Sequence, residues 1–200
     1  MKKPCLFGFF DWEAIGVCYR AIMMSVASGF LSKERILEQE VVVEPQWWDE
    51  LKNAVETVQA KQPDRIYIPP DRVARRLKER FGLELGSVPW QTAHGDLHWG
   101  NLTAPKFSIL DWETWGQAPF GFDVAQLHLM TLSQPETLAK VHQVFSAVVT
   151  KPEYDVALLY IIAEEMQRFD EYGDAPALQP YLRQEAERVL AARRFASFCR

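Results

Sequence analysis

Apolar side chains follow two patterns along the chain, one typical of strands and the other typical of helices. Residues 4–10 and 18–27 are rich in aromatic and branched side chains, so we expect two strands there, with residues 11–16 as the turn. From Pro45, apolar side chains recur at helical spacing as far as Val58, which predicts a helix. The chain therefore begins with predicted β-structure and continues with α-structure.

Start and stop signals mark the later elements. A second helix is expected from about Asp71, because Pro69-Pro70 precedes it and Gly82 follows its apolar stripe. A short strand is predicted over residues 107–110. Four more helices are predicted over residues 123–132, 134–149, 152–171 and 176–198. This order of elements indicates a mainly helical α+β protein.

Composition narrows the class of protein. A chain of 200 residues of which 48% are hydrophobic can bury one substantial core, and a net charge of -5 argues against nucleic acid as a partner. Three cysteines without a Cys-x-x-Cys pair indicate a reducing environment. The apolar run over 156–163 is too short to cross a bilayer, and charges after residue 10 argue against a signal peptide. We therefore expect a cytoplasmic protein with no membrane partner.

Residues 94–101, His-Gly-Asp-Leu-His-Trp-Gly-Asn, concentrate polar side chains in a segment whose glycines indicate a loop. Phosphoryl transfer from ATP needs a carboxylate that accepts the hydroxyl proton and oxygen ligands for Mg²⁺. Asp96 is a candidate for the first role, and Asn101 and Asp111 are candidates for the second. The Asp96-x-x-x-x-Asn101 interval is that of the protein-kinase motif His-Arg-Asp-x-x-x-x-Asn, with Gly95 in place of Arg.

A family resemblance follows from these motifs. His-Gly-Asp-Leu-His-x-x-Asn, then Ile-Leu-Asp-Trp-Glu over 109–113 and a Gly-to-Asp segment over 116–123, resembles the aminoglycoside phosphotransferase and choline kinase superfamily. The resemblance extends loosely over residues 18–200 and implies a protein-kinase-like fold. It also implies transfer of the γ-phosphate of ATP (or GTP) to a small-molecule hydroxyl, with Mg²⁺. By this resemblance Asp96 is the catalytic base, and Asn101 and Asp111 are the magnesium ligands.

The same resemblance assigns supporting roles to other residues. His94 is similar to the histidine that packs the catalytic loop, and Asp123 to the buried aspartate that holds the loop backbone, while also being a plausible N-cap. Glu113 is either an auxiliary metal contact or a surface carboxylate. His98 either packs the loop or relays a proton.

The kinase-like fold begins with a small β lobe, whose Gly-rich loop and Lys hold the phosphates. No Gly-x-Gly-x-x-Gly occurs here, and Lys2 and Lys3 lie at the amino terminus rather than within a strand. Residues 1–29 therefore resemble a two-strand remnant of that lobe, and residues 30–200 the helical catalytic lobe. Within the remnant, residues 25–29 look like the hinge that contacts adenine. The nucleotide-binding residues predicted from this resemblance are Met24, Ser25 and Ala27.

The acceptor pocket is expected between the helices after Asp123 and the helices over 46–60 and 71–81. Four acids in that region either contact an amine-bearing substrate or face solvent: Glu164, Glu165, Asp170 and Glu171. A two-strand remnant would also have an unpaired edge, and unpaired edges recruit partners. We therefore expect a homodimer, or another bound chain, along the edge of residues 4–10 or 18–24.

Two alternatives stay open. The missing Gly-rich loop and Lys favour a catalytically silent, pseudokinase-like binding protein. The other is a truncated gene product. A binuclear metallophosphatase, which the run from Gly95 to Asn101 also suggests, is set aside, because that site needs more ligands than the four histidines of this chain supply and no His-x-His occurs.

Overall fold

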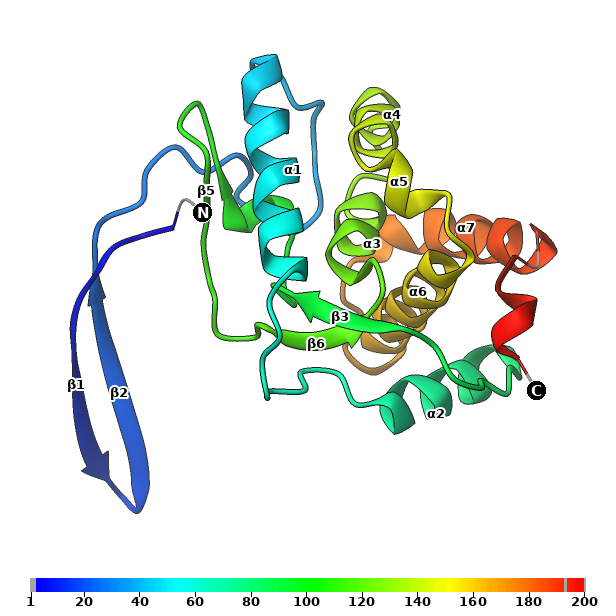
Figure 1. Ribbon diagram of the computed structural model, residues 1–200, viewed down its shortest axis with the longest axis horizontal. Coiled ribbons are helices and arrows are strands. Elements are labelled where there is room, and N and C mark those ends of the chain that lie inside the picture. The colour runs from blue at the N-terminus through cyan, green and yellow to red at the C-terminus, as the bar shows by residue number, and fades with distance from the viewer. Residues whose placement is uncertain (1–2, 193, 200) are drawn as a thin grey trace.

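Figure 1 shows a computed structural model of the protein, which describes residues 3–192 and 194–199. A long β-hairpin projects from one side of a helical body, and the C-terminal end lies near α2 (Pro70–Phe81). The protein is a mixed α+β structure, as the pattern of the sequence predicts. No helix in the described ranges combines the length and the apolar character needed to cross a membrane.

The hairpin consists of β1 (Leu6–Ala14) and β2 (Val17–Met24), paired antiparallel. Its turn is shorter than the predicted turn over residues 11–16, because β1 continues to Ala14. Ile15 and Gly16, with φ of 55° and 71°, alone form the turn. Two successive residues with positive φ are typical of the type I′ turn, whose twist matches that of the flanking strands. The local pairing of the strands therefore lengthened β1 at the expense of the predicted loop.

The hairpin joins the body at Gly29. The backbone carbonyl of Gly29 accepts a hydrogen bond from the N–H of Ala104 at 2.7 Å, and Leu31 donates to the carbonyl of Leu102 at 2.9 Å. Gly29 has φ of 73°, and a Cβ there would lie 2.1 Å from the carbonyl oxygen of Ala104. Only glycine allows the chain to pass this close to the body.

Both helices that were predicted in the first half are confirmed. α1 (Pro45–Gln59) begins with a proline at its first turn and buries the apolar stripe seen in the sequence. α2 begins at Pro70 and ends at Gly82, whose φ of 67° is the left-handed conformation that closes many helices.

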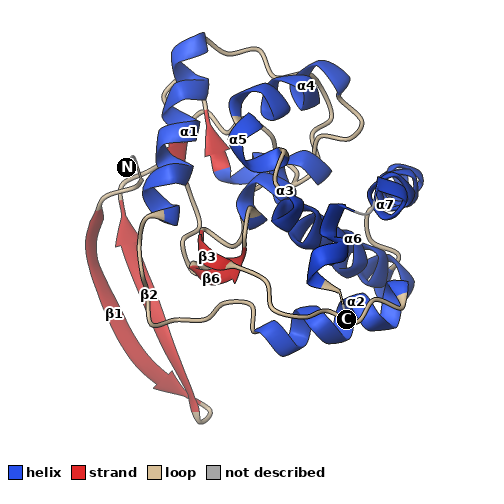
Figure 2. Ribbon diagram, turned by 45° about the vertical axis from the view of Figure 1, so that its right-hand side comes forward, coloured by secondary structure: helices blue, strands red, loops and turns tan. Residues whose placement is uncertain are grey.

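Two small antiparallel sheets lie within the body (Figure 2). β3 (Trp90–Ala93) pairs with β6 (Gly116–Pro119), and β4 (Leu102–Thr103) pairs with β5 (Ser108–Ile109). The strand predicted over 107–110 corresponds to β5, whereas β3 and β6 were not predicted. They are too short to show a period, and β6 contains a glycine and a proline.

The second half is helical, as predicted, with interruptions. The helix predicted over 134–149 divides at Phe145, and the helix predicted over 176–198 begins with a 3₁₀ turn and ends at Ala192. Asp123 is not an N-cap, since Gly121 occupies that position. The helices are α3 (Phe122–Leu129), α4 (Pro135–Val144), α5 (Ser146–Val149), α6 (Pro152–Tyr172) and α7 (Gln179–Ala192).

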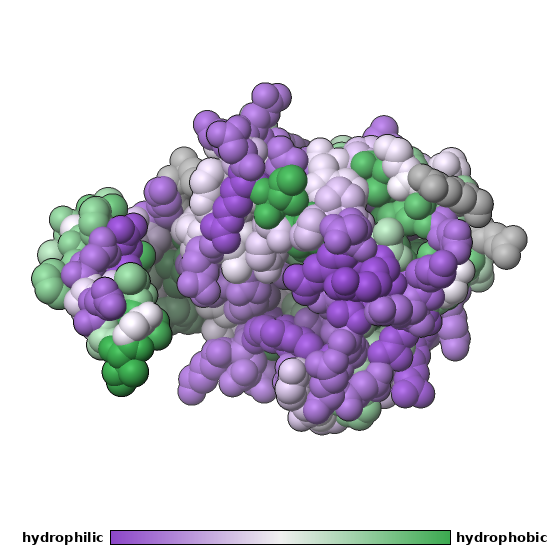
Figure 3. All heavy atoms as spheres, turned by 90° about the horizontal axis from the view of Figure 1, so that it is seen from below, coloured by the Kyte–Doolittle hydropathy of each residue, from purple (hydrophilic) through white to green (hydrophobic). Residues whose placement is uncertain are grey.

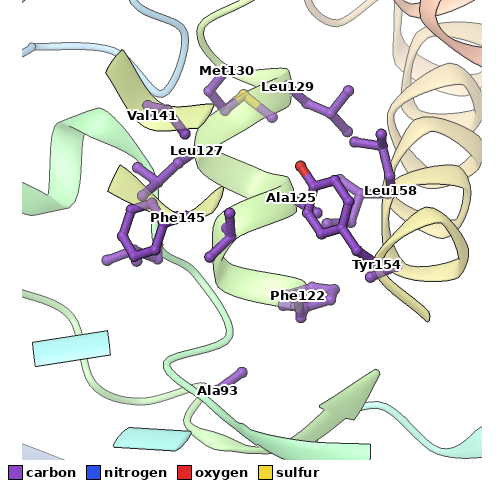
Figure 4. Packing of buried hydrophobic residues seen from close by; sticks show 14 of the residues in the cluster. Ala93, Phe122, Ala125, Leu127, Leu129, Met130, Val141, Phe145, Tyr154 and Leu158 are labelled. Atoms are coloured by element: carbon purple, nitrogen blue, oxygen red, sulfur yellow. The ribbon is translucent and has the colours of Figure 1, made fainter. Parts of the chain in front are cut away.

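The helix α3 lies in the middle of the hydrophobic core (Figure 4). Within α3, the side chain of Leu127 packs toward Phe145, whereas that of Leu129 packs toward Leu158 of α6. Because α3 is surrounded by buried apolar side chains, packing on all sides fixes its position in the fold. That position matters for the site, because Asp123 is in its first turn.

Candidate active site

A buried carboxylate, that of Asp123, binds the backbone of the loop over residues 94–101. Asp123 accepts hydrogen bonds from the backbone N–H of His94 at 2.8 Å and of Gly95 at 3.0 Å. Burial raises the pKa of Asp123, while His94 and the two N–H donors oppose this rise. The carboxylate thus satisfies two backbone donors that would otherwise be buried without partners.

Both ring nitrogens of His94 are used inside the loop. Nε2 lies 2.8 Å from the carbonyl oxygen of Leu110, and Nδ1 accepts from the N–H of Asp96 at 3.3 Å. This pattern requires the neutral tautomer with its proton on Nε2. The ring also packs edge-on against Trp112, with 4.6 Å between centroids. His94 is 1% exposed and therefore joins the loop to the 110–112 segment rather than meeting a ligand.

Asp96 lies at the surface of the loop with its carboxylate partly accessible. The side-chain amide of Asn101 donates to the backbone carbonyl of Asp96 at 2.9 Å and to its Oδ2 at 3.3 Å. His98 Nε2 lies 3.5 Å from the same Oδ2. Burial raises the pKa of Asp96. The hydrogen bond and charge of His98, together with the charges of His94 and Arg35, lower this pKa by a larger amount, so the net shift is downward. Asp96 is therefore ionised at neutral pH.

His98 also has a role in the backbone. Its Nδ1 accepts from the N–H of Gly100 at 3.1 Å, which caps the 3₁₀ turn over residues 99–101. With Nδ1 accepting, the proton of a neutral ring lies on Nε2 and points at Asp96. His98 therefore both packs the loop and touches the candidate base.

The two predicted magnesium ligands come from adjacent chain segments. The N–H of Leu110 donates to the backbone carbonyl of Asn101 at 2.9 Å, which places Asp111 one residue beyond this bond. Asp111 is exposed with φ of 56°, a conformation that aspartate tolerates better than most residues. Glu113 is also exposed. Within residues 3–192 and 194–199, no hydrogen bond engages the amide oxygen of Asn101, so this oxygen is available as a ligand.

Part of the predicted hinge over residues 25–29 forms hydrogen bonds with the segment that leads into the hairpin. The N–H of Ser25 donates to the carbonyl of Cys5 at 2.8 Å, and the N–H of Cys5 donates to Ser25 Oγ at 2.9 Å. Ser25 and Ala27 line a cleft of about 370 Å³ that also contains Lys106. Met24 pairs with the start of β1 and is not among the residues lining this cleft. The structure thus brings two of the three predicted nucleotide-binding residues together.

Lys3 is a residue that sequence reasoning set aside. Its ammonium lies 6.0 Å from the ring centroid of Trp112, directly after Asp111. It lines the cleft of Ser25 and also a neighbouring cleft of about 450 Å³, where Lys61 and Trp115 are found. No ion pair engages Lys3 within the described part of the chain. Lys2 lies outside the described residues. No feature of the sequence indicates that Lys3 lies beside Trp112, because the location of Lys3 depends on how the chain enters the hairpin.

Arginines neutralise the acids that were considered as substrate contacts. Arg35 makes a two-point ion pair with Glu165, at 2.9 and 3.1 Å, and also reaches Asp174. Burial lowers the pKa of Arg35, but the neighbouring carboxylates raise it, so the net shift is upward. The remaining pairs are Arg72 and Arg76 with Glu164, and Arg80 with Asp170, while Glu171 bonds Gln167.

These pairs correct both readings for Glu164 and Glu165. Glu165 is 7% exposed and Glu164 joins two arginines, so neither faces solvent alone or offers an unpaired charge to an amine. Asp170 and Glu171 are exposed, as the solvent-facing reading expected.

Arg35 acts electrostatically on Asp96, and it lies in the segment over 32–43 for which no regular element was predicted. Arg35 is therefore a neighbour of Asp96 that the sequence did not indicate.

Among the described residues, no group of three or more His, Cys, Asp or Glu side chains is placed to hold a metal ion. Comparison of the chain with models of known families, with curated proteins and with solved structures gives no match in any of the three.

Proposed function

We propose that the protein is a small-molecule phosphotransferase with a kinase-like fold, which moves the γ-phosphate of ATP or GTP to a hydroxyl group. One observation supports this most strongly. Asn101 donates through its side chain to Asp96 and accepts through its backbone from Leu110, so a single residue links the candidate base to the segment of Asp111. A base and two oxygen ligands are the parts that phosphoryl transfer requires of a protein.

Asp96 is the base in this proposal. Its lowered pKa keeps the carboxylate ionised, and the contacts with Asn101 and His98 orient it. As the acceptor oxygen attacks the γ-phosphorus, its O–H bond breaks and the proton passes to Asp96. The bond from the γ-phosphorus to the bridging oxygen breaks, and the nucleoside diphosphate leaves with that electron pair.

The amide oxygen of Asn101 and the carboxylate of Asp111 would hold Mg²⁺. Both are hard oxygen donors, and this cation commonly takes one or two protein ligands and completes its shell with waters and substrate phosphates. When bound, it would offset the negative charge of the phosphate oxygens. Glu113 lies two residues further along the same exposed segment.

We place this activity in the reducing cytoplasm as part of the proposal, where Cys5, Cys18 and Cys199 would remain free thiols. The acids Glu164 and Glu165 are paired with arginines, so they offer no unpaired negative charge to a polycationic acceptor.

A catalytically silent binding protein is the second candidate. The observation that favours it is the use of the Ser25 N–H within the hairpin, which removes a backbone donor from the predicted adenine site. No Gly-rich phosphate loop compensates for this loss.

The test is a phosphotransfer assay with ATP and GTP over a panel of aminoglycosides, choline, sugars, nucleosides and hydroxy acids. We expect transfer to at least one acceptor, and a fall in kcat of about 10²–10⁴ in Asp96→Asn. Asp49→Asn, an exposed aspartate on α1, is the matched control and should retain full activity. If no acceptor reacts while Mg·ATP binds, the silent candidate is favoured. Failure of both phosphotransfer and Mg·ATP binding would refute the phosphotransferase and also favour the silent candidate.

A further inference from the structure

The two faces of the β1–β2 hairpin differ in chemistry. Side chains alternate between faces along each strand, so the register assigns every residue to one side. One face includes Asp11 and Arg20, joined by an ion pair, with the Arg20 guanidinium 4.5 Å from the Phe9 ring centroid. This face also carries exposed Phe9 and Ile22, so it mixes charged and apolar side chains. The opposite face has no charged residue, and we call it the apolar face. It consists of Gly8, Phe10, Trp12, Ala14, Val17, Tyr19, Ala21 and Met23.

The apolar face is ordered within itself but uncovered. The rings of Phe10 and Trp12 stack with 6.1 Å between centroids, and those of Trp12 and Tyr19 with 5.3 Å. Phe10 is nevertheless 68% exposed and Met23 62% exposed. Figure 3 shows exposed apolar residues on the hairpin, mixed with hydrophilic ones, to the left of a mostly hydrophilic body.

An antiparallel sheet that faces water on one side normally packs its uncharged, apolar face against other apolar side chains. A two-stranded hairpin is also marginally stable when it is alone in water. A fully buried aromatic side chain contributes about 150–250 Å², so at the observed exposures the apolar face presents on the order of 600 Å². The largest apolar patch on a typical monomer is about 300–600 Å² in total, and such a patch is often functional. The hairpin is therefore built to be covered.

We propose that a second copy of this chain covers the apolar face, with two hairpins packed face to face about a twofold axis. Three features support a second copy over another partner. The exposed area is comparable to the roughly 800 Å² per subunit of a standard interface. The face carries no charge, so it does not require a partner of opposite charge. The stacked rings of Phe10, Trp12 and Tyr19 can interdigitate with their own copies, as in two sheets packed about 10 Å apart.

Face-to-face packing differs from the edge pairing expected from the sequence. Both hairpin edges are unpaired among the described residues, since β1 and β2 form a two-stranded sheet. Pairing along an edge would satisfy backbone groups but leave Phe10 and Met23 in water. Only a contact across the face removes them from solvent, and this proposal is independent of the proposed reaction.

The experiment is analytical ultracentrifugation of the full chain from about 1 to about 200 µM, where a standard interface should give a dimer. We expect Trp12→Glu to raise the dimer dissociation constant about 30-fold or more, as for a buried aromatic in an interface. Ile22→Glu, the same change on the opposite face, should leave it nearly unchanged. Circular dichroism checks that the helical body stays folded in both variants.

Three outcomes would overturn the proposal: a monomeric wild-type chain at the highest concentration, a dimer that survives Trp12→Glu, or equal disruption by Ile22→Glu. If the wild-type chain stays monomeric by itself and forms a complex only with a different protein, the apolar face would be assigned to that partner. Hydrogen exchange of the wild-type protein gives a readout without any variant. Hairpin amides should be better protected at high than at low protein concentration, and equal protection would count against the dimer.

Discussion

Asp123 accepts a hydrogen bond from the backbone N–H of His94 at 2.8 Å, although the two residues are 29 positions apart in the sequence. Because Asp123 is in the first turn of the buried helix α3, this bond ties the candidate catalytic loop to the core of the protein. The loop is thus positioned by a helix of the buried core.

The first prediction concerns this tie. Asp123→Asn places an amide nitrogen against one of two backbone donors, so a buried N–H loses its acceptor. We expect a fall in the free energy of unfolding of about 2–3 kcal/mol, measured by urea denaturation. Asp49→Asn should be indistinguishable from wild type, since Asp49 is exposed. Equal stability of both variants would contradict the role of Asp123.

The second prediction uses two glycines with positive φ. Gly95 has φ of 90°, and a Cβ there would lie 2.5 Å from the carbonyl oxygen of Thr114 and 2.9 Å from the Tyr67 ring. Gly82 has φ of 67° with nothing within 4 Å of its Cβ position. We expect Gly82→Ala to cost about 1 kcal/mol of unfolding free energy from backbone strain alone.

Gly95→Ala should cost about 3 kcal/mol or more, because its neighbours cannot move without shifting the loop. Chemical denaturation compares the two variants. Equal costs would show that the close approach of Gly95 to Thr114 is not important for stability.

The third prediction concerns the ion pair of Arg35 and Glu165. Arg35→Gln leaves a nearly buried carboxylate without its main partner, so we expect a loss of about 3 kcal/mol in stability. The double variant Arg35→Gln/Glu165→Gln should recover part of this loss, with a coupling energy of about 2 kcal/mol in a double-mutant cycle.

The exposed pair Arg20–Asp11 on the hairpin is the control cycle. Its geometry is similar, but water screens it, so its coupling should be clearly smaller. Additive effects of the Arg35 and Glu165 changes would refute the buried pair.

The fourth prediction concerns pH. His142 Nε2 lies 3.2 Å from His128 Nδ1, and burial, followed by the charge of His128, lowers the pKa of His142 to about 4. An unfolded histidine titrates near 6.5, so the unfolded chain binds this proton first. The stabilising contribution is therefore complete above about pH 6.5 and is lost as the pH falls toward 4.

The loss should amount to roughly 2 kcal/mol, and His142→Gln should remove this part of the pH dependence. Glu185 lies 3.2 Å from His128. Burial raises the pKa of Glu185, but Arg188 and His128 lower it by more, to about 2. Its contribution is complete above about pH 4.5 and is lost as the pH falls toward 2, so it adds to the loss only at the acid end of the measured range. Urea denaturation of both proteins between pH 7 and 4 makes the measurement, and parallel curves would contradict the assignment to His142.

The fifth prediction rests on the proposed function and concerns Lys3. If its ammonium meets nucleotide phosphates beside Asp111, Lys3→Ala should weaken Mg·ATP binding about tenfold or more in calorimetry. Lys151→Ala, an exposed lysine at the start of α6, is the control and should bind as the wild type does. An unchanged affinity in Lys3→Ala would remove Lys3 from the site without affecting the role of Asp96.

Much of the candidate site could be predicted because its residues are close in sequence. Asp96 and Asn101 lie in one loop, and their contact depends on the short path between them. The strand β3 and its partner β6 could not be predicted, because β6 begins at Gly116, beyond the whole catalytic segment. Lys3 and Arg35 were missed for the same reason, since their partners lie far along the chain.

The sequence by itself determined the helices from Pro45 and Pro70, the α+β class and the motif of residues 94–113. These depend on local backbone preferences, apolar periodicity and short spacings, all of which act between near neighbours. The role of Asp123 was already expected from the family resemblance, whereas tertiary contacts alone decided that arginines neutralise Glu164 and Glu165 and that the apolar face of the hairpin is left uncovered. Those features depend on which distant segments meet when the core is buried, and no local pattern encodes that meeting.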